Sequence, residues 1–302
     1  MSILVTGSSG TIGTRLCERL LGENMDIVGI DWKPNKWVKA INDSTILLDL
    51  RNEAECKKIP MHIDTIVHLA ANARVYELVE HPDRARDNFL TTFNILEHAR
   101  KNNIRRFLFA SSRECYGNAG KKMYAEEDAK LHTCESPYTA SKIGGEALVE
   151  AYKRCYDIET VIFRFSNVYG MYDDSVRVVP LFIRQARANN PLTIYGKKKY
   201  LDFTYIDDTV DGIVLALKKF ESAKNDTYNI AYGEGTSILD LAESVKNLMG
   251  STSQILVEES RTGEIVHFVA DISKARKKMG YNPQIPLQDG IKKAIEWYST
   301  HT

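Results

Sequence analysis

The 302-residue sequence predicts an α/β fold with a doubly wound parallel sheet and a smaller C-terminal region. Short apolar runs alternate with helical patterns up to about residue 170, an order typical of a parallel sheet covered by helices on both faces. A glycine-rich turn also joins the first apolar run to the first helical pattern. Such a turn is found where a strand of this kind of sheet passes directly into a helix.

The expected elements of the first half follow in order. Strands are expected at residues 3–6, 26–31, 45–50, 64–69, 106–111 and 159–164, and helices at residues 11–22, 82–102 and 136–156. The strand at 64–69 is nearly continuous in apolar residues, as a strand buried on both faces should be. Sheets of this class bind ligands at the carboxyl ends of their strands. Those ends carry Gly7, Asp31, Asp49, Ala70 and Ser111.

The glycine-rich turn is the first functional candidate. Gly7 and Gly10 permit a tight turn and a close approach of the backbone to a pyrophosphate, and Gly13 lets the helix pack closely on the strand. The helix that begins at Thr11 offers free N–H groups to the phosphates. Asp31 ends the second strand about 20 residues on, where a carboxylate binds the ribose 2′-hydroxyl of NAD and repels the 2′-phosphate of NADP. We therefore expect a Rossmann-type NAD site.

The alternation of strands and helices breaks after residue 170. Helices are expected at residues 180–188, 207–220, 237–249, 273–279 and 287–298, with short strands at 192–195 and 228–230. This tail is too fragmentary for a second dinucleotide domain. We expect residues 1–170 to form the NAD-binding domain, with parts of 200–232 returning to it, and residues 171–302 to form mainly a substrate-binding cap.

A Tyr–Lys pair is the second functional candidate. Tyr138 and Lys142 stand four residues apart, hence on one face of a helix. A nearby ammonium lowers the pKa of a tyrosine, which would let Tyr138 act as a base. Such a pair is usually only a solvated helix face. The hydroxyl donors Ser111 and Ser112, at the end of the preceding strand, favour the catalytic interpretation here.

The composition limits the possible partners. Forty basic and forty acidic residues cancel, so no basic surface suggests nucleic acid, and no apolar run is long enough for a membrane span. Five scattered cysteines without a C-x-x-C pair are typical of reduced thiols in a cytoplasmic protein. We expect no metal site.

Several segments together resemble the extended short-chain dehydrogenase/reductases, specifically the nucleotide-sugar epimerase/dehydratase family, which includes UDP-glucose 4-epimerases. In family order these are Thr6-Gly7-x-x-Gly10-x-x-Gly13, Asp49-Leu50, His68-Leu69-Ala70-Ala71, Asn88, Ser111-Ser112-Arg113-Glu114-Cys115-Tyr116-Gly117, Tyr138-x-x-x-Lys142, Arg164-Phe165-Ser166-Asn167-Val168-Tyr169-Gly170, Asp202-Phe203-Thr204-Tyr205-Ile206-Asp207-Asp208 and Arg261-Thr262-Gly263-Glu264. The resemblance covers nearly the whole chain. It specifies the family but no single substrate.

The resemblance implies a role for each matching position. It places NAD against Gly7, Gly10, Thr11, Ile12, Gly13, Asp31, Asp49, Leu50, Leu69, Ala70, Ala71, Asn88, Ser111, Tyr138, Lys142 and Ser166. It places the nucleotide sugar against Arg113, Asn167, Arg177, Tyr195 and Arg261, although Tyr195 could equally be core packing. Ser112 would bind the sugar hydroxyl that is oxidised, Tyr138 would remove its proton, and Lys142 would hold the nicotinamide ribose.

One departure from the family concerns the diphosphate. Leu201 stands where the family has an arginine that grips this group. The loss of one charge-assisted contact costs about 1.5–3 kcal/mol if nothing replaces it. Lys197, Lys198, Lys199 or Arg177 could supply the missing charge. The three lysines alone would normally be interpreted as a solvated basic loop.

A second departure is Arg113, which precedes Glu114. The resemblance implies an Asp-Glu pair here in dehydratases and Ser-Glu in decarboxylases. A guanidinium cannot serve as a general acid at neutral pH, which argues against ordinary dehydration. Arg113 could instead bind a sugar carboxylate, or pair with Glu114 or Glu135.

The sequence therefore predicts an NAD-dependent nucleotide-sugar 4-epimerase that acts on a UDP-hexose through a transient 4-keto sugar. The alternatives are a dehydratase or decarboxylase that uses Glu114, a 4-ketoreductase that releases its cofactor each turnover, and an NAD-binding regulator without catalysis. The resemblance also implies a homodimer formed through helices 82–102 and 136–156.

Overall fold

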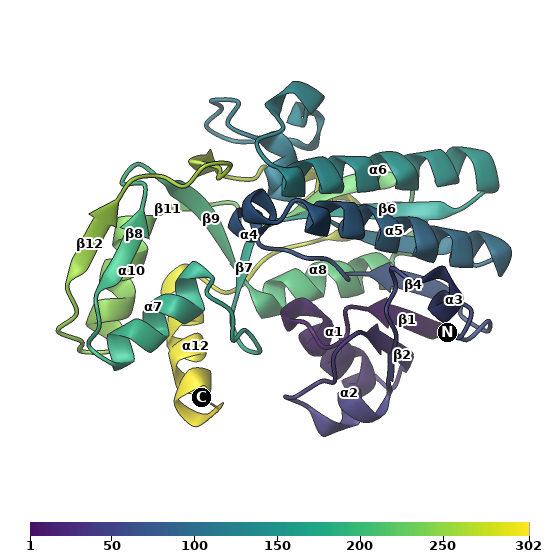
Figure 1. Ribbon diagram of the computed structural model, residues 1–302, viewed down its shortest axis with the longest axis horizontal. Coiled ribbons are helices and arrows are strands. Elements are labelled where there is room, and N and C mark those ends of the chain that lie inside the picture. The colour runs from purple at the N-terminus through teal and green to yellow at the C-terminus, as the bar shows by residue number, and fades with distance from the viewer. Residues whose placement is uncertain (302) are drawn as a thin grey trace.

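The computed structural model describes residues 1–301, which form a larger and a smaller lobe (Figure 1). The larger lobe contains a seven-stranded parallel sheet with the strand order β10-β6-β5-β4-β1-β2-β3. Its strands are β1 (Ser2–Thr6), β2 (Asp26–Asp31), β3 (Thr45–Leu47), β4 (Thr65–His68), β5 (Arg106–Ser112), β6 (Glu159–Phe165) and β10 (Asp226–Ile230). The predicted doubly wound α/β fold is thus confirmed. The strand order reverses between β1 and β4, where such sheets bind ligands.

Helices cover both faces of this sheet (Figure 1). One face is covered by α3 (Glu53–Cys56), α5 (Asp83–Lys101) and α6 (Pro137–Tyr156), with α4 (Val75–Glu80) beside them. The other face is covered by α1 (Thr11–Gly22), α8 (Ile206–Lys218) and α11 (Ser273–Met279), and the short helices α2 (Lys39–Asp43) and α9 (Phe220–Ala223) complete the layer. Three 3₁₀ turns, η1 (Arg113–Tyr116), η2 (Glu126–Asp128) and η3 (Leu131–Thr133), lie between β5 and α6.

The smaller lobe combines two short sheets with three helices. One sheet joins β7 (Asn167–Tyr169), β9 (Tyr200–Tyr205), β11 (Gly235–Ser237) and β13 (His267–Phe268), and the other pairs β8 (Leu192–Tyr195) with β12 (Ile255–Glu258). The helices are α7 (Val178–Arg187), α10 (Ile238–Leu248) and α12 (Leu287–His301). The N-terminus, where β1 begins, lies at the side of the large sheet opposite the smaller lobe (Figure 1). Because the strands are parallel to β1, their carboxyl ends face the smaller lobe.

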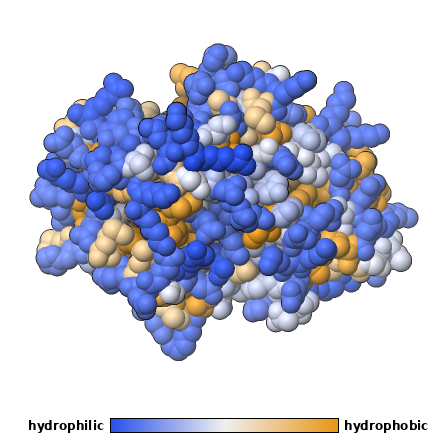
Figure 2. Space-filling view, turned by 180° about the vertical axis from the view of Figure 1, so that it is seen from behind, coloured by the Kyte–Doolittle hydropathy of each residue, from blue (hydrophilic) through white to orange (hydrophobic). Residues whose placement is uncertain are grey.

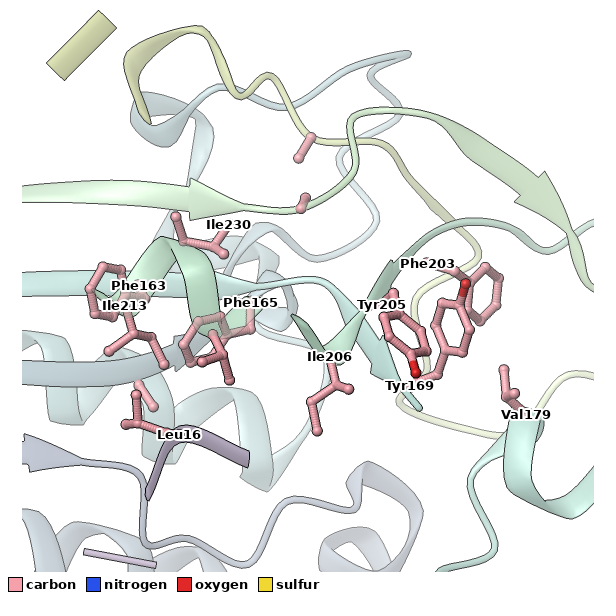
Figure 3. Close-up of a cluster of buried hydrophobic side chains, with 14 of the residues drawn as sticks. Leu16, Phe163, Phe165, Tyr169, Val179, Phe203, Tyr205, Ile206, Ile213 and Ile230 are labelled. Carbon is pink, nitrogen blue, oxygen red and sulfur yellow. The ribbon is translucent and has the colours of Figure 1, made fainter. Parts of the chain in front are cut away.

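A continuous apolar core ties the two lobes together (Figure 3). Phe163 and Phe165 of β6 lie against Ile213 of α8 beneath the large sheet. The same cluster continues through Ile206 to Tyr205, at the end of β9 in the smaller lobe. Since β9 runs directly into α8, one unbroken segment contributes to both lobes.

The structure corrects several sequence predictions. The third strand ends at Leu47 rather than at residue 50, because Asp49 enters a turn in which Asn52 N–H donates to its carbonyl. The sequence analysis predicted no strand at the position of β9. Its polar residues Asp202 and Thr204 suggest exposure, yet both are fully buried and hydrogen-bonded. The helix predicted from residue 82 begins at Asp83, after the separate helix α4, which the sequence analysis did not predict.

The surface is mainly polar on the face shown in Figure 2, where hydrophobic residues form small separate groups. Within residues 1–301, no helix combines the length and apolar character needed to cross a bilayer. The same residues contain no group of three or more histidine, cysteine or carboxylate side chains arranged to hold a metal ion.

Candidate active site

The glycine turn after β1 is built for close contact with a phosphate group. Gly7 has φ +74°, and its N–H donates to Ile30 O at 2.7 Å, which fixes the turn against β2. A Cβ atom at Gly13 would lie 2.0 Å from the Gly7 carbonyl oxygen, so no larger residue fits there. Gly10 is the N-cap residue of α1 and has no side chain that could accept a hydrogen bond from the first N–H groups of the helix. These N–H groups are therefore free to bind an anion. These features fit the pyrophosphate of a dinucleotide.

Asp31 lies at the carboxyl end of β2, as predicted. Its two carboxylate oxygens accept hydrogen bonds of 3.0 Å from the N–H groups of Ser9 and Lys33. Burial raises the pKa of Asp31, and these N–H groups partly oppose that rise. The carboxylate is therefore held in a fixed orientation beside the glycine turn, with lone pairs left for ribose hydroxyls.

Asp49 and Leu50 lie just beyond β3. Arg51 contacts both oxygens of Asp49, at 2.7–3.1 Å, and holds the pKa of that carboxyl below its usual range. The same guanidinium reaches Asp87 at 3.0 Å. Leu50 is buried, and its carbonyl accepts a hydrogen bond from Asn94 Nδ2 at 2.8 Å. An ion-paired Asp49 is a ready acceptor at the edge of the cofactor site.

The segment after β4 passes beside the glycine turn. Leu69, Ala70 and Ala71 are half-buried there, and a Cβ atom at Gly7 would meet the Ala70 nitrogen at 2.9 Å. His68 lies just before them and is fully hydrogen-bonded, with Nδ1 2.7 Å from Thr6 Oγ1. It is therefore a structural residue at the end of the strand.

Asn88 of α5 connects three segments. Its Oδ1 accepts from Asn72 N–H at 2.7 Å, and its Nδ2 donates to Asn72 O at 3.0 Å and to Ser141 Oγ at 3.1 Å. Ser141 lies on α6 between Tyr138 and Lys142. Asn88 thus fixes both the strand-end loop and the helix that carries the Tyr–Lys pair.

The structure brings together the three expected catalytic side chains. The Ser112 hydroxyl lies close enough to Tyr138 to lower the pKa of its phenol, and Lys142 Nζ lies 6.0 Å from the centre of the Tyr138 ring. Lys142 is buried and donates to Ala110 O at 2.7 Å, which holds its ammonium at the end of β5. The hydroxyl of Ser111 points elsewhere, to Glu146 in a buried network.

Lys142 was expected to lower the pKa of Tyr138, but in the structure this pKa is raised. Burial raises the pKa of Tyr138 to about 12, and the nearby Ser112 hydroxyl only partly offsets this rise. Burial also lowers the pKa of Lys142 to about 8. The prediction was wrong because it considered the charge of Lys142 without the cost of desolvating both groups.

Arg113 and Glu114 form a buried ion pair, with Nη2 2.9 Å from Oε1. Each also has one buried polar atom without a hydrogen-bond partner, Nη1 of Arg113 and Oε2 of Glu114. The N–H of Glu114 donates to Ser112 Oγ at 3.2 Å, so the pair adjoins the catalytic hydroxyl. Of the partners expected for Arg113, the structure selects Glu114. A hydrogen-bond donor, Nη1 of Arg113, and an acceptor, Oε2 of Glu114, are thus both unpaired near the Ser112 hydroxyl.

Ser166 and Asn167 are held by β9. The Ser166 hydroxyl donates to Asp202 O at 2.6 Å, and Asn167 Nδ2 donates to the same carbonyl at 2.8 Å. The carboxylate of Asp202 accepts from the N–H groups of Tyr232 and Gly233, and burial raises its pKa to about 6. Asp202 therefore ties the segment of Ser166 and Asn167 to that of Tyr232 and Gly233.

Leu201 is buried in the hydrophobic core and supplies no polar contact. Among the three nearby lysines, Lys197 and Lys198 are exposed, whereas Lys199 is buried and pairs with Glu264. The interpretation of all three as a solvated loop is therefore wrong for Lys199. Because Lys199 already has a carboxylate partner, it is a poor replacement for the family arginine.

Arg261 and Tyr195 meet directly, although they are far apart in the sequence. The Arg261 guanidinium lies 3.8 Å from the centre of the Tyr195 ring and 4.8 Å from that of Tyr76 on α4. Tyr76 was not predicted, because nothing in its local sequence indicates that α4 faces the smaller lobe. Arg177, at the start of α7, lies 3.6 Å from Asp173 and is close enough to lower the pKa of Tyr138. The second lobe thus places Arg177 near Tyr138 and Arg261 against the rings of Tyr195 and Tyr76.

Comparison with known proteins gives the family. The pattern of the NAD dependent epimerase/dehydratase family matches residues 3–231. The chain belongs to this family. It is 32% identical to a putative UDP-glucose 4-epimerase of Methanocaldococcus jannaschii, over 98% of this chain and 97% of that protein. It is 30% identical to a UDP-glucuronate 4-epimerase of Thermodesulfobacterium geofontis, over 97% and 95% of the two chains.

Solved structures of other epimerases share the whole fold. A Thermotoga maritima UDP-glucose 4-epimerase with UDP-glucose superposes with a TM-score of 0.92 at 27% identity, covering 100% of this chain and 99% of that one. A Bacillus cereus UDP-glucuronic acid 4-epimerase with UDP-glucuronic acid and NAD gives 0.91 at 29% identity, with complete coverage of both. As a member of this family, the chain is expected to use NAD, in agreement with its glycine turn and Asp31.

Proposed function

We propose that this epimerase/dehydratase family member is an NAD-dependent nucleotide-sugar 4-epimerase that acts on a UDP-hexose. The main support is the geometry of Ser112, Tyr138 and Lys142, which lie together where the glycine turn and Asp31 can hold the cofactor. Residues 1–170, together with β10, would bind NAD. Residues 171–302 would contribute mainly to the sugar-nucleotide site.

NAD, when bound, accepts a hydride from the sugar and returns it. Ser112 would bind the 4-hydroxyl, and the phenolate of Tyr138 would remove its proton as the C4 hydrogen leaves as hydride. Because burial raises the pKa of Tyr138, its phenolate must be stabilised when substrate and cofactor bind, and the ammonium of Lys142 is the buried positive charge on the same helix face that would do so. After the 4-keto sugar turns over, Tyr138 would return the proton and the hydride would arrive at the other face. No further acid or base is needed.

The ion pair of Arg113 and Glu114 supports epimerisation over elimination. A dehydratase needs a general acid to protonate the leaving hydroxyl, and Arg113 cannot serve. Arg113 pairs with Oε1 of Glu114, so the position of the missing acid holds the partner of the remaining carboxylate. Arg261, which contacts the rings of Tyr195 and Tyr76, and Arg177, whose Nη1 is 3.6 Å from Asp173 and so only loosely paired, could bind the diphosphate in place of the arginine that Leu201 replaces.

Proton NMR of the purified protein with UDP-glucose, UDP-galactose, their uronic acids and dTDP-glucose, without added NAD, tests this proposal. We expect the gluco and galacto anomeric signals to interconvert. Loss of the C6 signals or a pentose product would indicate a dehydratase or decarboxylase, and turnover only after NAD(P)H is supplied would indicate a reductase. Tyr138→Phe should lower the rate by at least about 10²-fold. Unchanged turnover in this variant would exclude the proposed mechanism.

We also infer a cytoplasmic homodimer that forms through α5 and α6. The two helices pack side by side, and α5 exposes Phe89, Leu90 and Phe93 by 40%, 37% and 40%. Three neighbouring apolar residues on one helix favour burial against a second copy. Light scattering after size-exclusion chromatography should give twice the chain mass, and Phe93→Asp should give the monomer. A monomeric wild-type protein at micromolar concentration would contradict the inference.

A further inference from the structure

An aromatic cluster joins three segments beside the glycine turn. Trp37 follows β2, Tyr172 follows β7, and Trp297 lies on α12, and we call their three rings the aromatic clasp. The Trp37 and Trp297 ring centres are 5.1 Å apart, and those of Tyr172 and Trp297 are 5.3 Å apart, both with edge-to-face geometry. Trp37 and Tyr172 complete the triangle at 6.3 Å. Edge-to-face aromatic pairs stabilise contacts beyond the area that they bury.

The first side of the clasp is fixed to the glycine turn through Asn35. This side chain is 6% exposed, and its Nδ2 donates to Thr14 Oγ1 at 2.8 Å and to Ser8 O at 3.3 Å. Its Oδ1 accepts from the N–H groups of Trp37 and Val38, both at 3.0 Å. The loop that carries Trp37 begins directly after Asp31. It is therefore attached to both the phosphate side and the ribose side of the cofactor site.

The second side of the clasp reaches the first turn of α1. Thr11 Oγ1 donates to Tyr172 O at 3.1 Å, and the Tyr172 hydroxyl donates to Glu18 Oε2 at 3.0 Å. Tyr172 has φ +63°, an uncommon conformation for a tyrosine that persists only where its surroundings hold it. An ion pair of Lys36 and Asp174 links the two sides directly.

The helix α12 closes the clasp from the smaller lobe. Tyr298, next to Trp297, donates from its hydroxyl to Gly170 O at 3.0 Å and to Asp173 O at 2.6 Å. In Figure 1, α12 lies at the lower edge of the smaller lobe, on the same side of the molecule as α2 and the loop that precedes it. The last helix of the chain thus holds together two loops that touch the phosphate-binding turn.

We propose that Trp37, Tyr172 and Trp297 are positioning residues that retain NAD between turnovers. The two loops are bonded to the glycine turn and to the first turn of α1, so opening of the clasp would loosen the segments that hold the dinucleotide. The proposal rests on the assignment of that turn to NAD. It adds a reason why this chain would keep its cofactor, as an epimerase must and a ketoreductase must not. By reciprocity, bound NAD must also favour the docked position of α12.

Release of NAD from the purified holoenzyme tests the proposal without any sugar. The protein is loaded with NAD, separated from free nucleotide, and diluted into an excess of NADH, and retained NAD is followed by chromatography. We expect Trp37→Ala and Trp297→Ala to release NAD at least 10-fold faster than wild type, and Trp297→Phe to restore part of the difference. The control is Tyr156→Ala, at the end of α6 that lies far from Tyr138. This variant removes a similar edge-to-face contact, because the ring centres of Tyr152 and Tyr156 are 5.0 Å apart.

Hydrogen exchange of the wild-type protein provides a test that needs no variant. NAD should slow amide exchange in α12 and in residues 35–38, in addition to the glycine turn. Release rates within twofold of wild type in both alanine variants, or NAD protection confined to the glycine turn, would overturn the clasp. A wild-type protein that binds no NAD would instead contradict the proposed function, so the two failures are distinguishable.

Discussion

Arg113 Nη2 lies 2.9 Å from Glu114 Oε1, so two adjacent residues of η1 form a buried ion pair next to Ser112. Burial raises the pKa of Glu114, and the guanidinium of Arg113 opposes that rise. The pair occupies the positions where dehydratases of the family would carry their acid and base. The ion pair occupies Oε1 of Glu114 and puts a guanidinium, which cannot donate a proton at neutral pH, where the acid would stand.

Glu114→Gln should therefore leave 4-epimerisation largely intact. The amide oxygen can still accept a hydrogen bond from Arg113, and the proposed proton transfer uses Tyr138. We expect kcat within about 10-fold of wild type, whereas Tyr138→Phe should lose at least about 10²-fold. A coupled assay of UDP-hexose interconversion measures both variants. A loss in Glu114→Gln as large as that in Tyr138→Phe would give Glu114 the role of a base.

Acid should destabilise the protein through His68. Its folded pKa, lowered to about 3 by burial, lies below the ordinary value of 6.5. Between these values the unfolded chain binds a proton that the folded chain does not, so the free energy of unfolding falls as pH falls, by up to about 1.4 kcal/mol per pH unit. Above pH 6.5 this contribution is complete and constant.

The test compares urea unfolding at pH 7 and pH 5 in His68→Gln and wild type. Glutamine can accept from Thr6 and donate to Thr92, yet it does not titrate. We expect the variant to lose less stability on acidification than wild type, by about 2 kcal/mol over this range. His132→Gln, at an exposed position, should behave as wild type. An equal acid-induced loss in all three proteins would show that His68 is not the sensitive group.

Two glycines of α1 should respond in opposite ways to alanine. A Cβ atom at Gly13 would lie 2.0 Å from the Gly7 carbonyl oxygen, so Gly13→Ala must displace the turn. We expect a loss of about 1–3 kcal/mol in stability and little NAD binding by calorimetry. Gly22→Ala meets nothing within 4 Å and should stabilise the helix by about 0.5–1 kcal/mol with NAD affinity unchanged. If Gly13→Ala binds NAD with normal affinity, the glycine turn is not part of the cofactor site.

The parts of the site that the sequence predicted depend on short stretches of chain. The glycine turn and Asp31 follow from one strand–turn–helix unit, and Tyr138 and Lys142 share one helix face. The parts that it missed depend on contacts between distant segments. Tyr76 lies beside Arg261 only because α4 meets the smaller lobe, and the burial that raises the pKa of Tyr138 comes from segments far apart in the sequence. A local pattern cannot report either.

At Leu201 the residue that the family resemblance implies, an arginine, does not fit the packing of this chain. The family arginine would have to sit in β9, where this chain has a core leucine that is 6% exposed. Leu201→Arg should therefore cost about 3–5 kcal/mol in stability, as expected for an unpaired buried charge, and should not tighten binding of UDP. Tyr200→Arg, at the exposed neighbouring position, should fold normally. Thermal unfolding and calorimetry with UDP measure both effects, and a stable Leu201→Arg with tighter UDP binding would mean that the cleft can still accommodate the family arginine.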